Sequence, residues 1–140
     1  MIVLDTNVIS ELMRPTPNPA VVAWLDRQPT QSVWTASICV FEIRMGLKRL
    51  PDGRRSRELE TRFQQVLQED LAGRVLDLDT SAAFASADIA AKIQPQGKPI
   101  ELRDLLIAGT VAARRGTLAT RNTKHFVHTE VSLINPWEQA

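Results

Sequence analysis

Three carboxylates stand at positions that ordinary packing does not explain. Asp5 directly follows the apolar run Ile2-Val3-Leu4, Glu42 lies in the middle of a strongly apolar stretch, and Asp104 precedes Leu105-Leu106-Ile107-Ala108. An ionised carboxylate against an apolar surface is costly unless a cation or an open cleft accompanies it. Carboxylate oxygens brought together from separate elements are the ligands that hard divalent cations such as Mg²⁺ and Mn²⁺ prefer. The three acids are therefore a candidate metal site.

Each acid taken singly also has a purely structural interpretation. Asp5 can cap the helix that follows it. Glu42 can form a buried ion pair with a nearby arginine, and Asp104 can sit favourably in the positive field at the start of its helix. Residue type and position leave these alternatives open for each acid alone. Taken together, three unpaired carboxylates would repel one another, and a bound cation would offset that repulsion.

The elements that position these acids alternate between strands and helices. Short β-prone runs predict strands at 2–4, 32–35, 75–78, 117–120 and 131–134, and apolar residues at helical spacing predict helices at 8–13, around 21–25, and at 36–50, 54–71, 80–93 and 101–115. Such alternation is typical of an α/β fold with a parallel sheet covered on both faces. Ligands bind at the carboxyl ends of the strands in such sheets, which is where Asp5 stands.

Three details of these elements bear on packing. The helix at 36–50 has hardly any polar face and is expected in the centre of the domain. Thr80 or Ser81 is expected to cap the helix at 80–93. Trp24, Trp34 and the apolar face of the helix at 54–71 fit either a core or an interface, and both interpretations stay open.

Length and composition indicate one globular domain over residues 1–140. The chain has 44% hydrophobic and 24% charged residues and a formal net charge of +1, which is ordinary for a folded protein. Its single cysteine, Cys39, fits a buried position in a reducing compartment, so a cytoplasmic location is expected. There is no secretory signal and no apolar run long enough to cross a bilayer, so no membrane partner is expected.

Seven of the 17 lysines and arginines fall between positions 44 and 62. Acids are interleaved among them, which favours a solvated, salt-bridged helix face over a phosphate-binding patch. No glycine-rich phosphate loop is present, and His125 and His128 with one distant cysteine do not make a zinc site.

The chain resembles the PIN-domain ribonucleases, specifically the VapC and FitB-like toxins of bacterial toxin–antitoxin pairs. The matching blocks, in order, are residues 2–11, Glu42, residues 104–108, residues 119–126 and Asn135-Pro136-Trp137. The resemblance implies a PIN-like α/β/α sandwich, with a central, mainly parallel sheet of four to five strands covered by helices on both faces.

The resemblance also implies a catalytic site. Asp5, Glu42 and Asp104 would be an acidic triad that holds one or two Mg²⁺ or Mn²⁺ ions, and metal-activated water would hydrolyse RNA phosphodiester bonds. Asn122 falls where many members place a fourth acid, and an amide can ligate but supplies no charge. The number of metal ions therefore stays open.

The same resemblance implies roles for residues next to the acids. Thr6 and Thr120 would orient ligands or water through their hydroxyls, and Arg121 could contact an RNA phosphate. His125 is expected to be a surface residue and not a ligand. With Asp5 engaged as a ligand, Thr6 and Asn7 become the expected helix caps.

The implied partners are RNA, a cognate VapB/FitA-like antitoxin protein that blocks the metal site, and a second copy of the chain in a homodimer. Promoter DNA would be reached only through the antitoxin. Two other functions stay open. One is an inactive PIN-like interaction subunit, which the missing charge at Asn122 would allow, and the other is a metal-dependent nuclease or phosphatase that acts on a substrate other than RNA.

Overall fold

A computed structural model describes residues 1–139, so that Ala140, the last residue of the expected domain, lies outside the described residues. Five strands form one sheet in the order β3-β2-β1-β4-β5, and every neighbouring pair is parallel. The strands are β1 (Ile2–Leu4), β2 (Val33–Ala36), β3 (Val75–Leu76), β4 (Thr117–Ala119) and β5 (Ser132–Ile134). The helices are α1 (Thr6–Leu12), α2 (Pro19–Asp26), α3 (Ser37–Lys48), α4 (Arg54–Gln65), α5 (Thr80–Ile93), α6 (Leu102–Ala113) and α7 (Thr123–Phe126).

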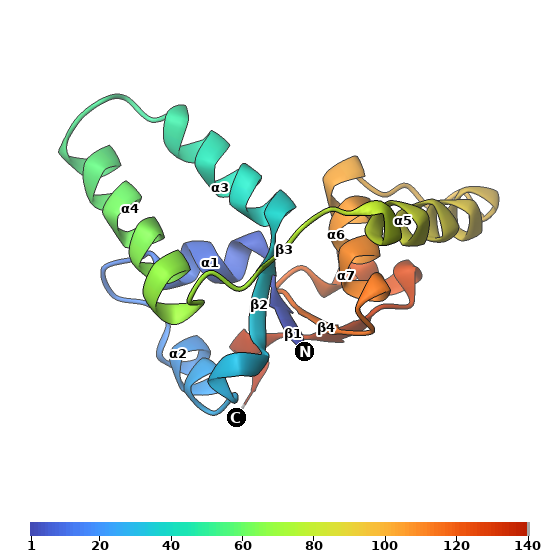
Figure 1. The fold of residues 1–140 in the computed structure, drawn as a ribbon, viewed down its shortest axis with the longest axis horizontal. Helices are drawn as coiled ribbons and strands as arrows, with labels where there is room; N and C mark the ends of the chain where they lie inside the picture. The colour runs from blue at the N-terminus through green and yellow to red at the C-terminus, as the bar shows by residue number, and fades with distance from the viewer. Residues whose placement is uncertain (140) are drawn as a thin grey trace.

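The sheet is covered by helices on both faces (Figure 1). Helices α1 to α4 lie on one side of the strands, and α5 to α7 lie on the other. The first strand is central, since Leu4 is paired with Thr35 of β2 and with Ala119 of β4. The predicted α/β/α sandwich with a parallel central sheet is therefore confirmed.

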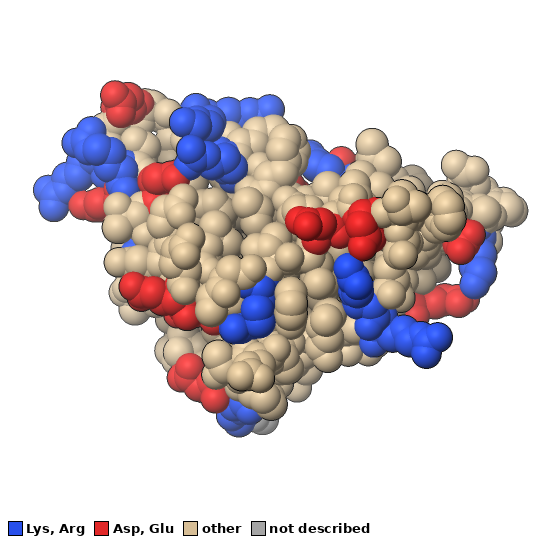
Figure 2. Space-filling model, in the orientation of Figure 1, with Lys and Arg blue, Asp and Glu red and all other residues tan. Residues whose placement is uncertain are grey.

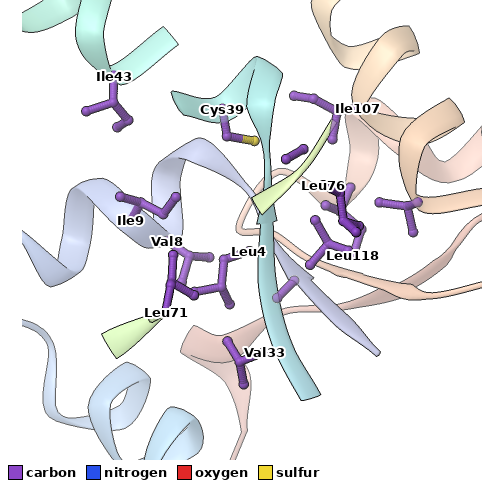
Figure 3. Packing of buried hydrophobic residues seen from close by; sticks show 14 of the residues in the cluster. Leu4, Val8, Ile9, Val33, Cys39, Ile43, Leu71, Leu76, Ile107 and Leu118 are labelled. Carbon is purple, nitrogen blue, oxygen red and sulfur yellow. The ribbon is translucent and has the colours of Figure 1, made fainter. Parts of the chain in front are cut away.

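The core forms on both faces of β1, as expected of a short apolar strand in a parallel sheet. Leu4 lies beside Val8 and Leu71 on the α1 side, whereas Leu118 and Ile107 pack on the α6 side (Figure 3). The sequence left open whether Trp24, Trp34 and the apolar face of the helix at 54–71 belong to the core or to an interface, and the structure places them in or against the core. Trp24 and the α4 residue Phe63 are buried in the core, and Trp34 is partly buried against that core.

Helix α3 is not the central helix that its composition predicts. Only Cys39 and Ile43 among its residues are buried, and Phe41 is 53% exposed. The reason is that α3 and α4 form a hairpin that extends beyond the strands, so that only part of α3 lies over the sheet (Figure 1). An apolar composition alone does not distinguish a central helix from one whose apolar face is left open.

Several boundaries differ because of local capping and packing. Helix α5 is capped by Asp79, whose side chain accepts from the Ala82 amide, and not by Thr80 or Ser81. Helix α4 passes at Val66–Asp70 into one π-helical turn, which places Val66 in the core. Strand β3 ends at Leu76, two residues before the predicted end at position 78. The short helix α7 was not predicted. No helix within residues 1–139 has the length and apolarity that a membrane span requires.

Basic side chains gather over the α3–α4 hairpin, at the upper left of Figure 2, with acids among them. Arg44 contacts Glu60 across the two helices, and Arg54 lies 2.9 Å from Glu58. This surface is the salt-bridged helix face that the interleaved charges predict.

Candidate active site

The four predicted ligands line one open cavity at the carboxyl edge of the sheet. Asp5 follows β1, Glu42 projects from α3, Asp104 lies in the first turn of α6, and Asn122 follows β4. Their cavity has a volume of about 560 Å³, and Arg14, Arg121 and Trp137 also line it. We call it the site cavity. Residues separated by up to 117 positions are thus brought together by the parallel order of β1, β2 and β4.

Asp5 is both a wall of the cavity and the cap of α1. Its Oδ1 accepts from the Thr6 amide at 2.8 Å, which corrects the expectation that Thr6 or Asn7 is the cap. Its other oxygen, Oδ2, accepts from the Thr120 hydroxyl at 2.8 Å and from the Asn7 amide nitrogen at 3.3 Å. One carboxylate can do both because its two oxygens serve different partners, so capping and ligation were not exclusive alternatives.

Thr120 and Asn7 form a small network behind Asp5. Thr120 is fully buried, and its hydroxyl also accepts from the Asn7 side chain at 3.2 Å and from the Asn122 amide at 3.0 Å. The side-chain oxygen of Asn7 accepts from the Arg121 amide at 3.1 Å. These bonds tie the loop after β4 to the start of α1, so that Asp5 has one fixed orientation. The orienting contact expected of Thr120 is present.

Glu42 is held by two neighbours and still faces the cavity. Its Oε1 accepts from the Thr6 hydroxyl at 3.1 Å, and its Oε2 lies 3.9 Å from Arg103 of α6. The Thr6 contact is the one that was expected. An arginine partner exists, as in the ion-pair interpretation, but it comes from α6 and not from the basic run beside Glu42. The Glu42 side chain is 21% exposed, so a ligand in the cavity can reach it.

Asp104 is positioned by the start of α6. Glu101 caps this helix by accepting from the amides of Arg103 and Asp104 at 3.0 and 3.3 Å. The carboxylate of Asp104 also lies 3.6 Å from Nδ1 of His125. His125 is exposed, as expected, yet it contacts a predicted ligand, which the sequence did not indicate.

The pKa values of all three acids are raised above their ordinary values. Burial is the largest cause of the raised pKa of Asp5, Glu42 and Asp104. The charge of Asp5 raises the pKa of Glu42 and of Asp104 further, and hydrogen bonds from Thr120 and Thr6 act in the opposite direction on Asp5. Raised pKa values on adjacent carboxyls are expected where a cation is needed to neutralise them.

Cys39 lies against the same centre. Its Sγ is 3.9 Å from Oδ1 of Asp5, and burial, followed by the charge of Asp5, raises its pKa to about 12. The side chain therefore stays a neutral thiol, consistent with the small buried residue that was expected.

The donor set fits a hard, hydrated cation better than a closed metal cage. No three His, Cys, Asp or Glu side chains within residues 1–139 converge closely enough to enclose an ion by themselves. An open cavity with carboxylates on separate walls suits Mg²⁺ or Mn²⁺, which keep part of their water shell. The residues that would hold such an ion are Asp5, Glu42 and Asp104, with Asn122 at the rim.

Sequence reasoning missed several residues of the cavity. Arg14 and Trp137 line it, Arg103 pairs with Glu42, and the Arg121 guanidinium stacks on the Trp137 ring at 5.0 Å from its centre. The only sequence signal for Trp137 is its place in the last matching block. Nothing in the local sequence connects Arg14 or Arg103 with the site, because the contacts come from the packing of α1 and α6.

With this geometry in place, comparison with known proteins identifies the family. Residues 2–131 match the PIN domain, and the chain belongs to that family. It is 42% identical over 140 residues to a protein named VapC ribonuclease Y4jK of Sinorhizobium fredii, with the whole of both chains covered.

Two further relatives come from the FitB branch of the family. The chain is 41% identical to toxin FitB of Neisseria gonorrhoeae, over 98% of this chain and 99% of that protein. A structure described as FitAB bound to an IR36 DNA fragment superposes with a TM-score of 0.89 at 40% identity, covering 100% of this chain and 98% of that one. The chain is thus a PIN-domain protein similar to VapC and FitB toxins.

Proposed function

We propose that the chain is the ribonuclease toxin of a toxin–antitoxin pair and cleaves RNA phosphodiester bonds with Mg²⁺ or Mn²⁺ in the cytoplasm. The observation that carries this proposal is the site cavity, in which Asp5, Glu42 and Asp104 from three elements meet with their pKa values raised. The similarity to a protein named VapC ribonuclease supports the nuclease activity.

The residues of the site cavity have different roles in the proposed hydrolysis. A bound divalent ion would supply a Lewis acid that polarises a phosphoryl oxygen and lowers the pKa of water. Asp5, Glu42 and Asp104 would hold that ion and offset its charge, while the hydroxyls of Thr120 and Thr6 donate hydrogen bonds that keep Asp5 and Glu42 in place. Arg121, which lines the cavity, can contact a phosphate of the substrate.

Single substitutions test the assignment. Asp5→Asn, Glu42→Gln and Asp104→Asn keep the shape of each side chain but remove its charge, so each should lower RNA cleavage in Mg²⁺ or Mn²⁺ more than about a hundredfold. Cleavage of a labelled RNA, with circular dichroism as a check on folding, is the measurement. Asp88→Asn on the exposed face of α5 is the matched control and should cleave normally. Full activity in any of the three variants would remove that residue from the site.

Two experiments distinguish the ribonuclease from a non-catalytic interaction subunit and from an enzyme that acts on another substrate. Calorimetric titration with Mn²⁺ should show binding by the wild type, and failure to bind near millimolar concentration would favour a non-catalytic interaction subunit. The titration is needed because Asn122 lines the cavity without adding a charge, which could weaken metal binding. A panel of RNA, single-stranded DNA and a phosphomonoester then reports the substrate class.

We also propose an antitoxin and a second copy of this chain as partners. A relative is described as FitAB bound to an IR36 DNA fragment, which supports a protein partner that binds this chain. We propose that this partner is a VapB/FitA-like antitoxin and that the chain would reach promoter DNA only through it. An antitoxin that blocks the site cavity should stop RNA cleavage at equimolar ratio. RNA cleavage that is unchanged at saturating antitoxin would contradict this role.

A further inference from the structure

A second hollow adjoins the site cavity on the far side of Asp104. It has a volume of about 290 Å³ and lies between the end of α5, the start of α6 and helix α7. The basic side chains that line it are Lys98, Lys124, His125 and His128. We call it the basic hollow.

The basic side chains of the basic hollow are available for a ligand. Lys98, Lys124 and His128 are exposed, and none of them has an ion-pair partner among residues 1–139. This contrasts with the α3–α4 hairpin, where Arg44 and Arg54 are paired with glutamates. Unpaired lysines around a concave surface favour an anion there.

The acids beside the hollow are already engaged. Glu101 accepts from two amides at the start of α6 and lies 3.2 Å from the Arg103 guanidinium. Asp104 lies 3.6 Å from Nδ1 of His125 and is one of the proposed metal ligands. The charge that remains for a ligand in the hollow is therefore positive.

Asp104 lines both the site cavity and the basic hollow, so the two are continuous along one wall. Arg14 and Arg121 line the site cavity as well: Arg14 lies 3.0 Å from Glu11, whereas Arg121 stacks on the Trp137 ring. The carboxylates of the site cavity thus have the unpaired lysines of the basic hollow beside them, and Arg121 lines the same cavity as they do. A polyanion with regularly spaced phosphates fits this arrangement, because one phosphate can lie at the lysines while the neighbouring phosphodiester bond lies at the carboxylates.

We propose that Lys98, Lys124 and His128 form a subsite for a backbone phosphate of single-stranded RNA, next to the phosphate that is cleaved. The proposal rests on the proposed function, because it assigns the place of the substrate beside the metal centre. The contacts are to phosphate and carry no base preference. The subsite would hold the RNA in register while the carboxylate centre acts on the neighbouring bond.

Binding of RNA without cleavage tests the subsite independently of activity. A fluorescent single-stranded RNA is titrated in EDTA with the wild type, with Lys98→Ala/Lys124→Ala, and with Lys48→Ala/Arg55→Ala, which removes two exposed charges from the α3–α4 hairpin. The subsite variant should bind roughly tenfold more weakly, and the control should bind within about twofold of the wild type. Thermal melting should show that all three proteins are folded, because the substituted side chains are exposed.

Salt dependence supplies a second readout that a structural defect would not mimic. Each lysine that neutralises a phosphate of single-stranded RNA contributes about 0.7 to the slope of log affinity against log salt, so the subsite variant should lose about 1.4. In Mg²⁺ the same variant should raise KM with kcat nearly unchanged, since a remote phosphate contact is made equally before and during the reaction.

The outcomes separate the two proposals. A subsite variant that matches the control in affinity and salt slope overturns the subsite, whether or not the wild type cleaves RNA. A wild type that binds RNA through these lysines but leaves it intact in Mg²⁺ retains the subsite and overturns the proposed ribonuclease activity.

Discussion

Thr120 shows how single residues organise the site. Its buried hydroxyl donates to Asp5 and accepts from Asn7 and from the Asn122 amide. A hydroxyl has one proton and two lone pairs, so this set satisfies it completely. The loop after β4 is thereby tied to the end of β1 through one atom, which explains why a threonine serves better here than an isosteric valine.

The raised pKa of Asp104, caused first by burial and then by the charges of Asp5 and Glu101, predicts a measurable effect of pH on stability. Because the pKa of Asp104 is raised in the folded protein, the folded state binds this proton more tightly than the unfolded state does. The metal-free protein therefore loses stability as the pH rises from the ordinary value of 3.8 through the raised one. Asp104→Asn should melt about 3 °C higher than the wild type in EDTA at pH 7.5.

The difference should shrink as the pH falls toward 3.8, where Asp104 is protonated in both states. Millimolar Mg²⁺ should reverse the order, since an ion that binds only the folded wild type stabilises it. Asp88→Asn is again the control. A metal-free Asp104→Asn protein that melts at or below the wild-type temperature at pH 7.5 would show that the ionised carboxylate does not destabilise the folded protein.

At the scale of elements, the position of Asp104 depends on how closely α6 packs on α5. Gly109 permits this approach. A Cβ built at this position would lie 1.8 Å from Oγ of Ser86 and 2.7 Å from the Ser86 backbone nitrogen, closer than atoms can stand. The hydroxyl of Ser86 is itself occupied with the Ala82 carbonyl at 2.8 Å. Any larger residue must push the two helices apart.

Gly109→Ala should therefore lower the free energy of unfolding by about 3 kcal/mol, the upper range for overpacking a core. It should also reduce RNA cleavage, because Asp104 lies five residues earlier on the same helix. Gly46→Ala is the matched control. Gly46 is within α3 and has nothing within 4 Å of an added Cβ, so this change should stabilise by about 0.5–1 kcal/mol. Urea unfolding measures the free energy of unfolding of both variants. Equal changes in Gly109→Ala and Gly46→Ala would contradict the close contact between α5 and α6.

At the scale of the whole molecule, large apolar side chains are exposed on both helices that carry an acid. Phe41 is 53% exposed beside Glu42, and Leu102 is 63% exposed beside Arg103. The Glu42–Arg103 contact joins their helices, α3 and α6. Exposed apolar residues on adjacent elements are typical of an interface, which agrees with the proposed homodimer.

Phe41→Glu should convert the proposed dimer into a monomer, because a charge would replace an apolar contact in the interface. Light scattering coupled to size-exclusion chromatography measures the mass. Val127→Glu introduces the same charge at a residue 58% exposed near α7 and should leave the dimer intact. A Phe41→Glu protein with the mass of the wild-type dimer would place the interface elsewhere.

Much of the fold could be predicted because it is encoded locally. The alternation of β-prone runs with helical apolar spacing identified all five strands and six of the seven described helices, and proline and glycine placed most of their ends. Asp5, Glu42 and Asp104 were also visible as unusual acids, since Asp5 follows an apolar run, Glu42 interrupts one and Asp104 precedes one. Capping was predicted poorly at Asp5 and Asp79, because neighbouring polar residues compete for one cap and only the backbone conformation decides among them.

The sequence by itself determined which residue types are available for metal chemistry and which family of folds can position them, since both depend on local pattern. Only the tertiary structure decided the strand order, the exposure of α3, the approach of Arg103 to Glu42 and of His125 to Asp104, and the basic hollow beside the site. These features join residues from distant parts of the chain. They depend on how helices pack across a twisted sheet, and no short stretch of sequence contains that information.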